Sequence, residues 1–229
     1  MNIIKKIKEH NKKISGNVFL FDEEKDIKLE YNRQLPKNIF ITDCGESNIV
    51  KVHSNIKARN IKIYFSPNTK NCSCILDDSG DSAGLDIEVI FLDGEKSELK
   101  IGKRTGMNGT KIWLGNGSKC FIGDDCRFSY EIIIRTTDGH TIIDNETKEI
   151  INNQKCPCII GNSCWIGLRS IINKNVQLPN DTIVGSGSVV TGQFDKPYTI
   201  IAGNPAKIIK EGVKHNRENI YMYTKRNSK

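Results

Sequence analysis

Histidine is the side chain that titrates closest to neutral pH, and this chain has four of them. One, His140, lies in a D-x-H motif two residues after Asp138, while the others lie near the termini or in a less regular stretch. An imidazole can take the proton from a hydroxyl group, which is a poor nucleophile while protonated. A carboxylate can fix the imidazole tautomer and stabilise the imidazolium that forms. His140 is therefore a candidate general base. The alternative is a turn in which His140 bonds nearby backbone.

An aliphatic residue returns at every sixth position between Cys158 and Gln193. This period fits neither an amphipathic helix nor a single half-buried strand, and it is typical of a solenoid. If each hexad is one short strand and a turn, three hexads close a triangular coil whose recurring residue points inward. Gly161, Gly167 and Gly185 follow inward positions, where a corner would crowd a larger side chain. The predicted inward residues are Ile160, Ile166, Ile172, Leu178, Val184 and Val190.

The same period is present upstream, at Ile122, Phe128 and Ile134, and the next step of six lands on His140. We therefore expect His140 at a corner of a coil rather than in its interior. The repeat then breaks over residues 141–158. An insertion in a solenoid leaves the coil as a loop, and such loops lie over the binding face.

The remaining segments set the predicted boundaries. Residues 1–40 are expected to form an N-terminal cap, because the end of a solenoid must be polar or covered. Residues 41–195 form the coils, with irregular turns in the early ones. Residues 196–229 form a C-terminal extension in which Pro197 and Pro205 prevent a regular ladder. The charged tail is expected to be disordered or to form a short helix that crosses to a neighbouring subunit.

The composition fits one domain with a narrow core. Hydrophobic residues make up 37% of the chain and aromatic residues only 7%, and a prism of Ile and Val needs few large rings. The formal charge of +7 and the pI near 8.9 favour anionic partners such as a phosphorylated cofactor, an acidic glycan or a membrane surface. The alternative is that lysine is simply the preferred surface residue.

No run of eighteen apolar residues and no secretory signal is present, so we expect the protein in the cytoplasm. Residues 1–13 combine isoleucines with lysines, which is typical of a basic amphipathic helix. Such a helix packs on the protein's own surface or a neighbouring subunit, or it makes a peripheral contact with the inner face of an anionic membrane.

Eight cysteines raise the question of a metal site or a disulfide. The closest pairs have C-x-C spacing, which is not the C-x-x-C spacing of zinc ligands. Two other pairs lie six residues apart and match the repeat, so that they can stack as small hydrophobes. We expect buried, reduced thiols and no metal site. The two pairs are Cys120 with Cys126 and Cys158 with Cys164.

The order of four segments resembles a known family. IIGNSCWIG (159–167), VGSGSVVT (184–191) and AGNPAKII (202–209) are similar to the last coils and closing segment of the hexapeptide-repeat acyltransferases. FIGDDCRFSYEIIIRTTDGHTIID (121–144) resembles the branch that O-acetylates sugars of capsules and lipopolysaccharide. The resemblance covers roughly residues 99–212. It implies an all-β fold: a left-handed parallel β-helix with irregular N-terminal coils, an inserted loop and a short C-terminal extension.

The resemblance assigns roles to the polar residues singled out above. It makes His140 the catalytic base. Asp138 is expected to support it, although Asp138 could instead stabilise the turn and Asp144 take the supporting role or contact the acceptor. Trp165 matches an aromatic position of the family and is expected to form a wall of the acceptor pocket or to pack at a subunit interface.

The resemblance also implies acetyl-CoA as cosubstrate, since the chain has no nucleotide-binding fingerprint of its own. In the family, backbone N–H groups of late coils bind the pantetheine arm between neighbouring solenoids, and a lysine can meet the nucleotide phosphates. The positions expected to do so here are Gly167, Ser186, Gly187 and Thr191 for the arm and Lys207 for the phosphates.

The implied function is transfer of an acetyl group to a hydroxyl of a sugar or polysaccharide acceptor by a homotrimer whose active sites lie between subunits. No nucleic acid is expected as a partner. The main alternative is an N-acetyltransferase acting on an amino sugar, which would use the same parts. A non-enzymatic scaffold is a further alternative, in which the loss of His140 would have no consequence.

Overall fold

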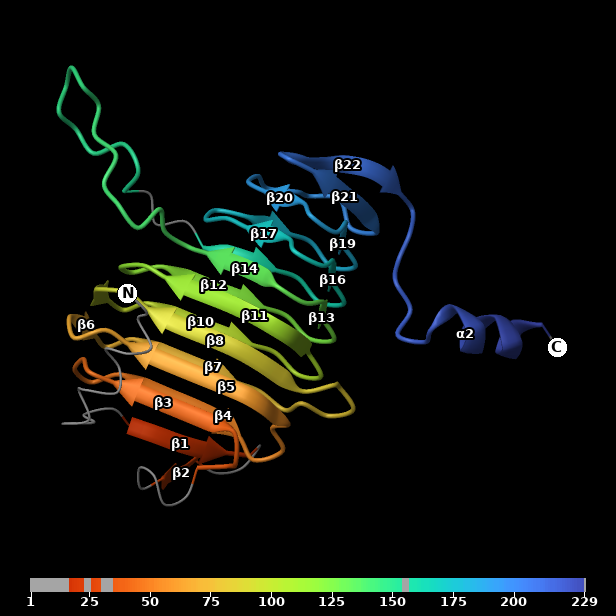
Figure 1. Cartoon of the computed structure of the whole chain (residues 1–229), viewed down its shortest axis with the longest axis horizontal. Coiled ribbons are helices and arrows are strands. Elements are labelled where there is room, and N and C mark those ends of the chain that lie inside the picture. Colours follow the sequence, from red (N-terminus) through yellow and green to blue (C-terminus); the bar gives the residue numbers. More distant parts are fainter. Residues whose placement is uncertain (1–16, 23–25, 30–34, 154–156, 229) are drawn as a thin grey trace.

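The chain forms a stack of coils whose strands run parallel from one coil to the next (Figure 1). The computed structural model describes residues 17–22, 26–29, 35–153 and 157–228. In the later coils each side of the prism holds one short strand. In the earlier coils a long strand bends over two sides. The predicted all-β, parallel solenoid is confirmed.

The first face of the prism is a sheet of parallel strands that ends in one antiparallel strand. In spatial order it contains β18 (Gln177–Leu178), β15 (Cys158–Ile160), β12 (Lys119–Ile122), β10 (Glu98–Ile101), β7 (Ser73–Leu76), β4 (Ile49–His53), β1 (Asn17–Phe21) and the antiparallel β2 (Asp26–Leu29).

The second and third faces share one sheet because long strands cross their common corner. The strand β11 pairs with β13 through Gly106 and Met107 and with β14 from Thr110 to Trp113, and its register shifts between these two parts. The second face contains β20 (Val189–Val190), β17 (Ile171–Ile172), β14 (Ile132–Arg135), β11 (Gly106–Leu114), β8 (Leu85–Phe91), β5 (Ala58–Phe65) and β3 (Ile39–Asp43). The third face adds β13 (Arg127–Phe128), β16 (Trp165–Ile166), β19 (Ile183–Val184), β21 (Thr199–Gly203) and the antiparallel β22 (Ala206–Glu211).

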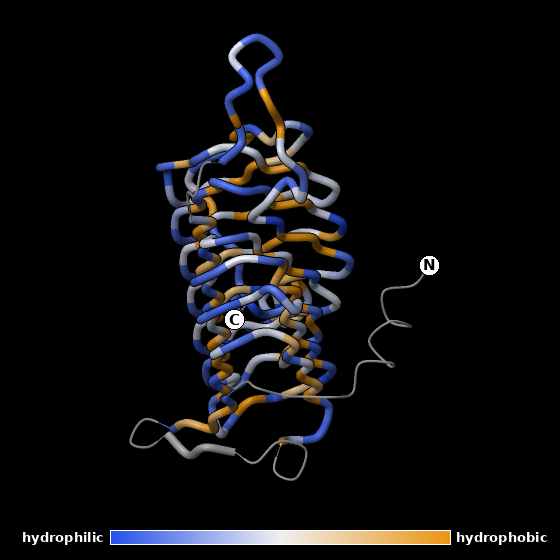
Figure 2. Tube along the Cα trace, turned by 90° about the vertical axis from the view of Figure 1, so that its left-hand side faces the viewer, coloured by the Kyte–Doolittle hydropathy of each residue, from blue (hydrophilic) through white to orange (hydrophobic). Residues whose placement is uncertain are grey.

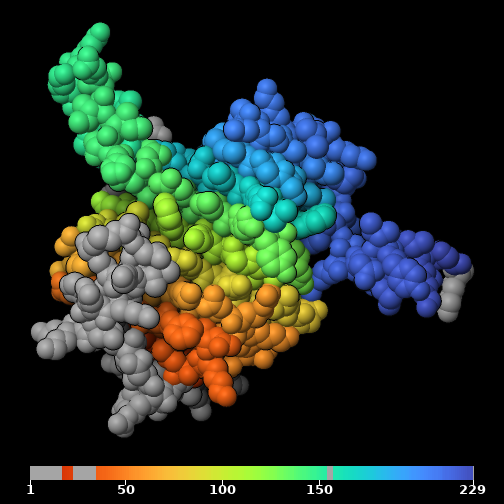
Figure 3. All heavy atoms as spheres, in the orientation of Figure 1, coloured from red at the N-terminus to blue at the C-terminus, as the bar shows by residue number. Residues whose placement is uncertain are grey.

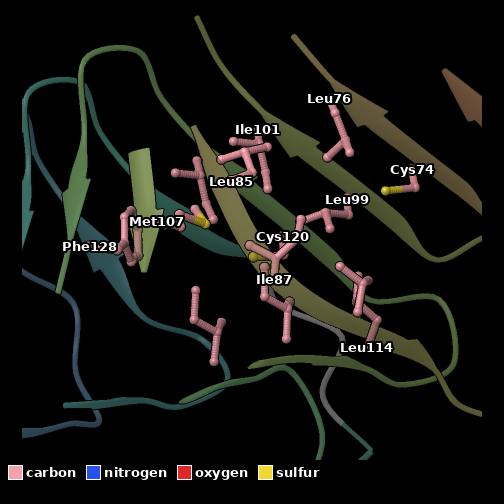
Figure 4. Packing of buried hydrophobic residues seen from close by; sticks show 14 of the residues in the cluster. Cys74, Leu76, Leu85, Ile87, Leu99, Ile101, Met107, Leu114, Cys120 and Phe128 are labelled. Atoms are coloured by element: carbon pink, nitrogen blue, oxygen red, sulfur yellow. The ribbon is translucent and has the colours of Figure 1, made fainter. Parts of the chain in front are cut away.

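The hexad residues fill the interior of the prism. All six of the predicted inward residues between Ile160 and Val190 are buried, as are Ile122, Phe128 and Ile134. Each stacks on an equivalent residue one coil away; Ile122, for example, pairs with Ile160. Figure 4 shows Phe128 together with buried side chains of the earlier coils, such as Leu76 and Leu99, between the strands, and Figure 2 shows apolar and polar stretches alternating along the coils. Burial of one such side chain stabilises the fold by about 1.5–3 kcal/mol.

The cysteines contribute to the same interior. Cys120 is in register with Cys158, and Cys126 lies beside Cys164; all four are buried and free. A hydrogen bond with the neighbouring thiol, together with burial, raises the pKa of Cys120 and Cys126. The expectation of stacked, buried thiols is confirmed for these four. Cys156 lies outside the described residues.

The two ends of the prism differ from the expected boundaries in detail. Val18 of the predicted cap is buried, and its strand β1 pairs in parallel with β4, so this part of the cap continues the first face. The parallel ladder also extends beyond residue 195, because β21 pairs with β19. An extended arm then leads to α2 (Ile220–Asn227), so the tail contains a short helix, while its crossing to a neighbouring subunit stays a prediction. The proposed basic helix at residues 1–13 lies outside the described residues.

Leu178 and Gln177 provide a matched test of the coil geometry, because Leu178 is 1% exposed while its neighbour faces solvent. We expect Leu178→Ala to lower the free energy of unfolding by about 2–5 kcal/mol, since it leaves a cavity in a narrow core. Gln177→Ala is expected to change it by less than about 0.5 kcal/mol. Urea unfolding at equal protein concentrations measures both. Equal losses would contradict the assigned register.

Candidate active site

The D-x-H motif lies at a solvent-exposed corner. We define the His140 corner as residues 136–140, which join β14 to the inserted segment. His140 is exposed, as predicted for a corner position, and its imidazole makes no hydrogen bond to the described residues. The side chain borders a cavity of about 550 Å³ that is also lined by Asp93, Asn116, Thr137 and Asn152. A volume in this range suits a small polar ligand.

Three successive coils present the same kind of turn at this corner. The pairs Phe91 with Leu114 and Trp113 with Arg135 fix the register. Continued into the turn, this register aligns Asp93-Gly94, Asn116-Gly117 and Asp138-Gly139 in one column, and each of these glycines has a positive φ. A Cβ at Gly94 would lie 2.4 Å from the Asn116 side chain above it. Glycine therefore allows the coils to stack closely beneath the His140 corner.

The Asp138 carboxylate is bound by a cation of the next coil. Its Oδ2 accepts a hydrogen bond of 2.5 Å from Lys174 Nζ and one of 2.9 Å from Asn152 Nδ2. These donors, Lys174 first, hold the pKa of the Asp138 carboxyl below its usual range. Within this chain Asp138 therefore contacts Lys174 and Asn152 rather than the imidazole of His140.

Asn152 links the motif to the inserted segment. Besides Asp138, its amide nitrogen donates to the carbonyl oxygen of His140 at 2.8 Å, and its Oδ1 accepts from the backbone N–H of Ile142 at 2.9 Å. One amide thus connects the carboxylate, the histidine backbone and the base of the insertion. This fixes the direction in which the chain leaves the corner.

The inserted segment is a projecting hairpin whose described part is residues 141–153 (Figure 1). Asp144 organises its tip: its Oδ1 accepts from the backbone N–H groups of Glu146 and Thr147 at 2.9 and 2.8 Å. These bonds, the one from Thr147 first, lower the pKa of Asp144. Asp144 is therefore held in a turn and makes no described contact with His140. The hairpin also exposes apolar side chains at Ile142, Ile143, Ile150 and Ile151.

Trp165 lies on the third face, whereas His140 lies where the second face turns toward the first. The indole is 45% exposed, and its ring centroid is 6.2 Å from that of His215 in the C-terminal arm. A second cavity of about 1090 Å³ separates Arg127 and Trp165 from this arm and from α2. Burial and the charge of Arg127 lower the pKa of His215. One chain does not bring His140 and Trp165 together; the hairpin and the arm project on opposite sides (Figure 3).

Arg217 fastens the C-terminal arm to the coils. Its guanidinium donates to both carboxylate oxygens of Asp81, at 2.8 and 3.0 Å, and to Asp125. Asp125 also receives two hydrogen bonds from Arg104. This network fixes the arm beside the cavity that Trp165 lines. Helix α2 itself has no buried residue among those described.

The residues expected to hold a pantetheine arm fall into two groups. Gly167, Ser186 and Gly187 share the corner between the third and second faces, and Lys207 lies on β22, which pairs with β21 beside that corner. Thr191 lies at the next corner along the coil, after β20. The structure thus collects four of the five positions and separates Thr191 from them.

One part of that expectation requires correction. The backbone N–H of Gly167 donates to the carbonyl of Val184 at 2.8 Å, and that of Gly187 donates to Leu168 at 2.7 Å. Neither N–H is free to bind a ligand, because the ladder between coils already uses it. Gly187 instead offers space, because a Cβ there would meet nothing within 4 Å, whereas a Cβ at Gly167 would lie 2.6 Å from the backbone nitrogen of Ser186.

Asn152, Lys174 and Asn116 were not predicted from the sequence. Lys174 reaches Asp138 from the next coil and Asn152 reaches it from the insertion. Contacts between residues this far apart in the sequence leave no local spacing pattern from which they could be predicted. Asn116 could have been found, because the pairs Asp93-Gly94, Asn116-Gly117 and Asp138-Gly139 recur at nearly constant spacing.

Comparisons with known proteins place this geometry in context, although no protein-family model matches the chain. Over 117 residues it is 32% identical to the polysialic acid O-acetyltransferase of Escherichia coli O1:K1, covering 51% of this chain and 38% of that protein. It is 28% identical to the galactoside O-acetyltransferase of Escherichia coli K12 over 132 residues, covering 58% and 62% of the two chains. The chain therefore spans less than two thirds of the length of these relatives.

A solved structure matches over a greater length. The polysialic acid O-acetyltransferase OatWY aligns with a TM-score of 0.70 and 26% identity, covering 94% of this chain and 96% of that one. A match of this length includes most of the early coils, where the hexads are irregular. It agrees with the left-handed parallel β-helix expected from the sequence.

The ion pair at Asp138 predicts a shift in its titration. Because the folded pKa is lowered, the stability that Asp138 contributes is present above its unfolded pKa of about 3.9 and is lost as the pH falls through the folded value. Lys174→Met should raise the pKa of the Asp138 carboxyl toward its ordinary value, which NMR titration of carboxyl carbons measures. The control is Lys196→Met, which breaks the exposed Lys196–Glu211 pair elsewhere and should leave Asp138 unchanged. An unchanged Asp138 in Lys174→Met would contradict the assigned pairing.

Proposed function

We propose that this chain, a member of the hexapeptide-repeat acyltransferases, transfers an acetyl group from acetyl-CoA to a hydroxyl of a surface-glycan sugar of the capsule or O-antigen type. The observation that carries the proposal is the His140 corner: an exposed imidazole at the edge of a cavity lined by amides and hydroxyls. Two relatives are named as O-acetyltransferases of polysialic acid and of galactosides, and these names support a glycan as the acceptor.

In the proposed reaction His140 acts first as a base and then as an acid. Its imidazole takes the proton from the acceptor hydroxyl, so that the oxygen can attack the thioester carbonyl. When the carbon–sulfur bond breaks, the imidazolium returns that proton to the leaving sulfur. Asn152 supports the step by holding the backbone of His140, and Asp138 supports it through Asn152. Asp138 is thus a positioning residue in this scheme.

Acetyl-CoA supplies an activated acetyl group to this site. The residues present fit such a molecule: the surface at Gly187 is open, Ser186 is exposed beside it, and Lys207 makes no ion pair with the described residues. An extended pantetheine arm could lie along this corner with its phosphates near Lys207. Thr191 would contact it only from the adjacent corner.

The proposed active assembly is a homotrimer. His140 and Trp165 lie on opposite sides of one chain, so a shared site needs His140 of one subunit and Trp165 of the next. Exposed isoleucines on the hairpin and an α2 without buried residues favour contacts with other copies. In this arrangement Trp165 lines the acceptor pocket and packs at the interface at once, and Asp144 keeps the hairpin tip in shape near the acceptor.

An N-acetyltransferase acting on an amino sugar is the second candidate, because an amine could replace the acceptor hydroxyl without any change in the residues proposed to catalyse the transfer and to bind acetyl-CoA.

The proposed location is the cytoplasm, where acetyl-CoA is available. Peripheral membrane contact through residues 1–13 is a further proposal. Among the described residues, no helix has the length and apolar character that a membrane crossing requires.

The first test measures the release of the CoA thiol from acetyl-CoA in the presence of each member of a panel of sugars and amino sugars. His140→Ala is expected to lower turnover by roughly 10²- to 10⁴-fold, because it removes the general base. Its thermal midpoint should stay close to that of the wild type, since the side chain is exposed and unbonded. Full turnover in a folded His140→Ala protein would refute the mechanism, and activity on amines alone would favour the second candidate.

Mixed oligomers test the sharing of sites between subunits. His140→Ala and Trp165→Ala are each expected to be inactive or weak alone. When they are co-expressed in equal amounts, roughly a quarter of the sites in a cyclic assembly regain both native residues. Recovered thiol release in the mixture is the expected result. No recovery from oligomers shown by mass spectrometry to contain both variants would contradict the shared site.

A further inference from the structure

We propose that Asp93 is an acceptor-binding residue that holds one hydroxyl of a neutral sugar while His140 activates another. This inference rests on the proposed function and narrows its substrate class to an uncharged, hydroxyl-rich sugar. Asp93 lines the same cavity as His140 although it lies two coils away in the sequence.

Hydrogen bonds from the preceding coil hold the Asp93 carboxylate in place. Ser66 Oγ donates to its Oδ1, and Asn68 Nδ2 donates to its Oδ2 at 3.0 Å. These hydrogen bonds, that from Ser66 first, hold the pKa of Asp93 below its usual range, so the group is ionised at neutral pH. Both donors belong to the preceding coil, on the side away from His140. The carboxylate is therefore oriented before any ligand arrives.

Asp93 retains capacity to accept one more hydrogen bond. The two carboxylate oxygens have four lone pairs in all, and three described donors use them: Ser66 Oγ, Asn68 Nδ2 and the backbone N–H of Asn68. The side chain is exposed where it borders the cavity. The remaining lone pair can accept from one sugar hydroxyl, and hydrogen bonds to a charged acceptor are stronger than neutral ones.

The spacing of the coils fits one sugar ring. Asp93, Asn116 and Asp138 occupy equivalent positions on three successive coils, which are about 4.8 Å apart, so Asp93 lies about 10 Å from the His140 corner along the axis. Hydrogen bonds of about 2.8 Å at either end leave about 4 Å between the outer hydroxyl oxygens. Non-adjacent hydroxyls of one pyranose ring have a similar separation. Asn116 lies between the two ends and can bond the ring substituents.

The charges around the cavity disfavour an anionic sugar. Among its described lining residues, Asp93 is the only carboxylate, and there is no lysine or arginine. Lys174, which lines an adjoining smaller cavity, is paired with Asp138. A sugar carboxylate placed here would face Asp93 without a compensating cation, and like charges at short range are costly. The geometry therefore favours neutral hexoses over acidic sugars at this position.

Steady-state kinetics with methyl hexosides as neutral acceptors and a sialic acid oligomer as the anionic acceptor test the proposal. Asp93→Ala is expected to raise KM for the best neutral acceptor by roughly 10- to 100-fold, because a hydrogen bond to a charged group is lost. The change in kcat should be much smaller, and KM for acetyl-CoA should be unchanged. Asp93→Asn, which removes the charge but keeps the shape, should improve kcat/KM for the anionic acceptor relative to wild type.

Glu88→Gln is the matched control, since Glu88 lies on β8, the strand that precedes Asp93, but pairs with Lys111 and does not line the cavity. It should leave all constants unchanged. An unchanged KM in Asp93→Ala, or a wild-type preference for the anionic acceptor, would overturn the proposal while leaving acetyl transfer at His140 intact.

Saturation-transfer NMR separates this proposal from the transfer reaction itself. If no acceptor supports thiol release, binding of the methyl hexosides to the wild-type protein and to Asp93→Ala still reports on the subsite. Binding that Asp93→Ala weakens and Glu88→Gln does not is the expected result. Absence of neutral-sugar binding to the wild-type protein, or equal binding to all three proteins, would overturn the proposal.

Discussion

The stacking of each coil on an equivalent coil is the interaction on which this structure depends. Ile122, Ile160 and Leu178 pair in sequence along the first face, and each buries its side chain because the one above and the one below are also aliphatic. The backbone hydrogen bonds between coils have the same requirement, since every strand needs a neighbour. Because the interior repeats, the corners repeat as well, and side chains from distant parts of the sequence form columns on the outside.

The sequence predicts the interior well, because the period of six follows directly from the shape of one coil. Each residue expected to point inward between Ile160 and Val190 does so. The early coils are harder to predict, because their corners differ in length: Phe91 pairs with Leu114 and Leu99 with Cys120, so one corner is two residues longer than the next. A single inserted residue in a turn hides the period without disturbing the stack.

The site is less predictable than the fold, because its contacts join different coils. His140 is recognisable from its motif and lies at the expected corner, yet the partners of Asp138 are Lys174 and Asn152, which belong to the next coil and to the insertion. The backbone N–H of Gly167 was expected to bind a ligand, but it donates to the carbonyl of Val184 in the ladder between coils. Trp165 lies on another face, so the role proposed for it needs a neighbouring copy of the chain.

The column of Asp93, Asn116 and Asp138 keeps the proposed contacts with the acceptor apart from the residues that form the core. The interior fixes where each corner lies, while the exposed side chain at that corner contributes little to the core. A substitution there changes one rung of the outer surface and leaves the scaffold intact. Such an architecture can diversify its choice of ligand stepwise, by exchanging single residues at fixed heights, without redesigning the body that supports them.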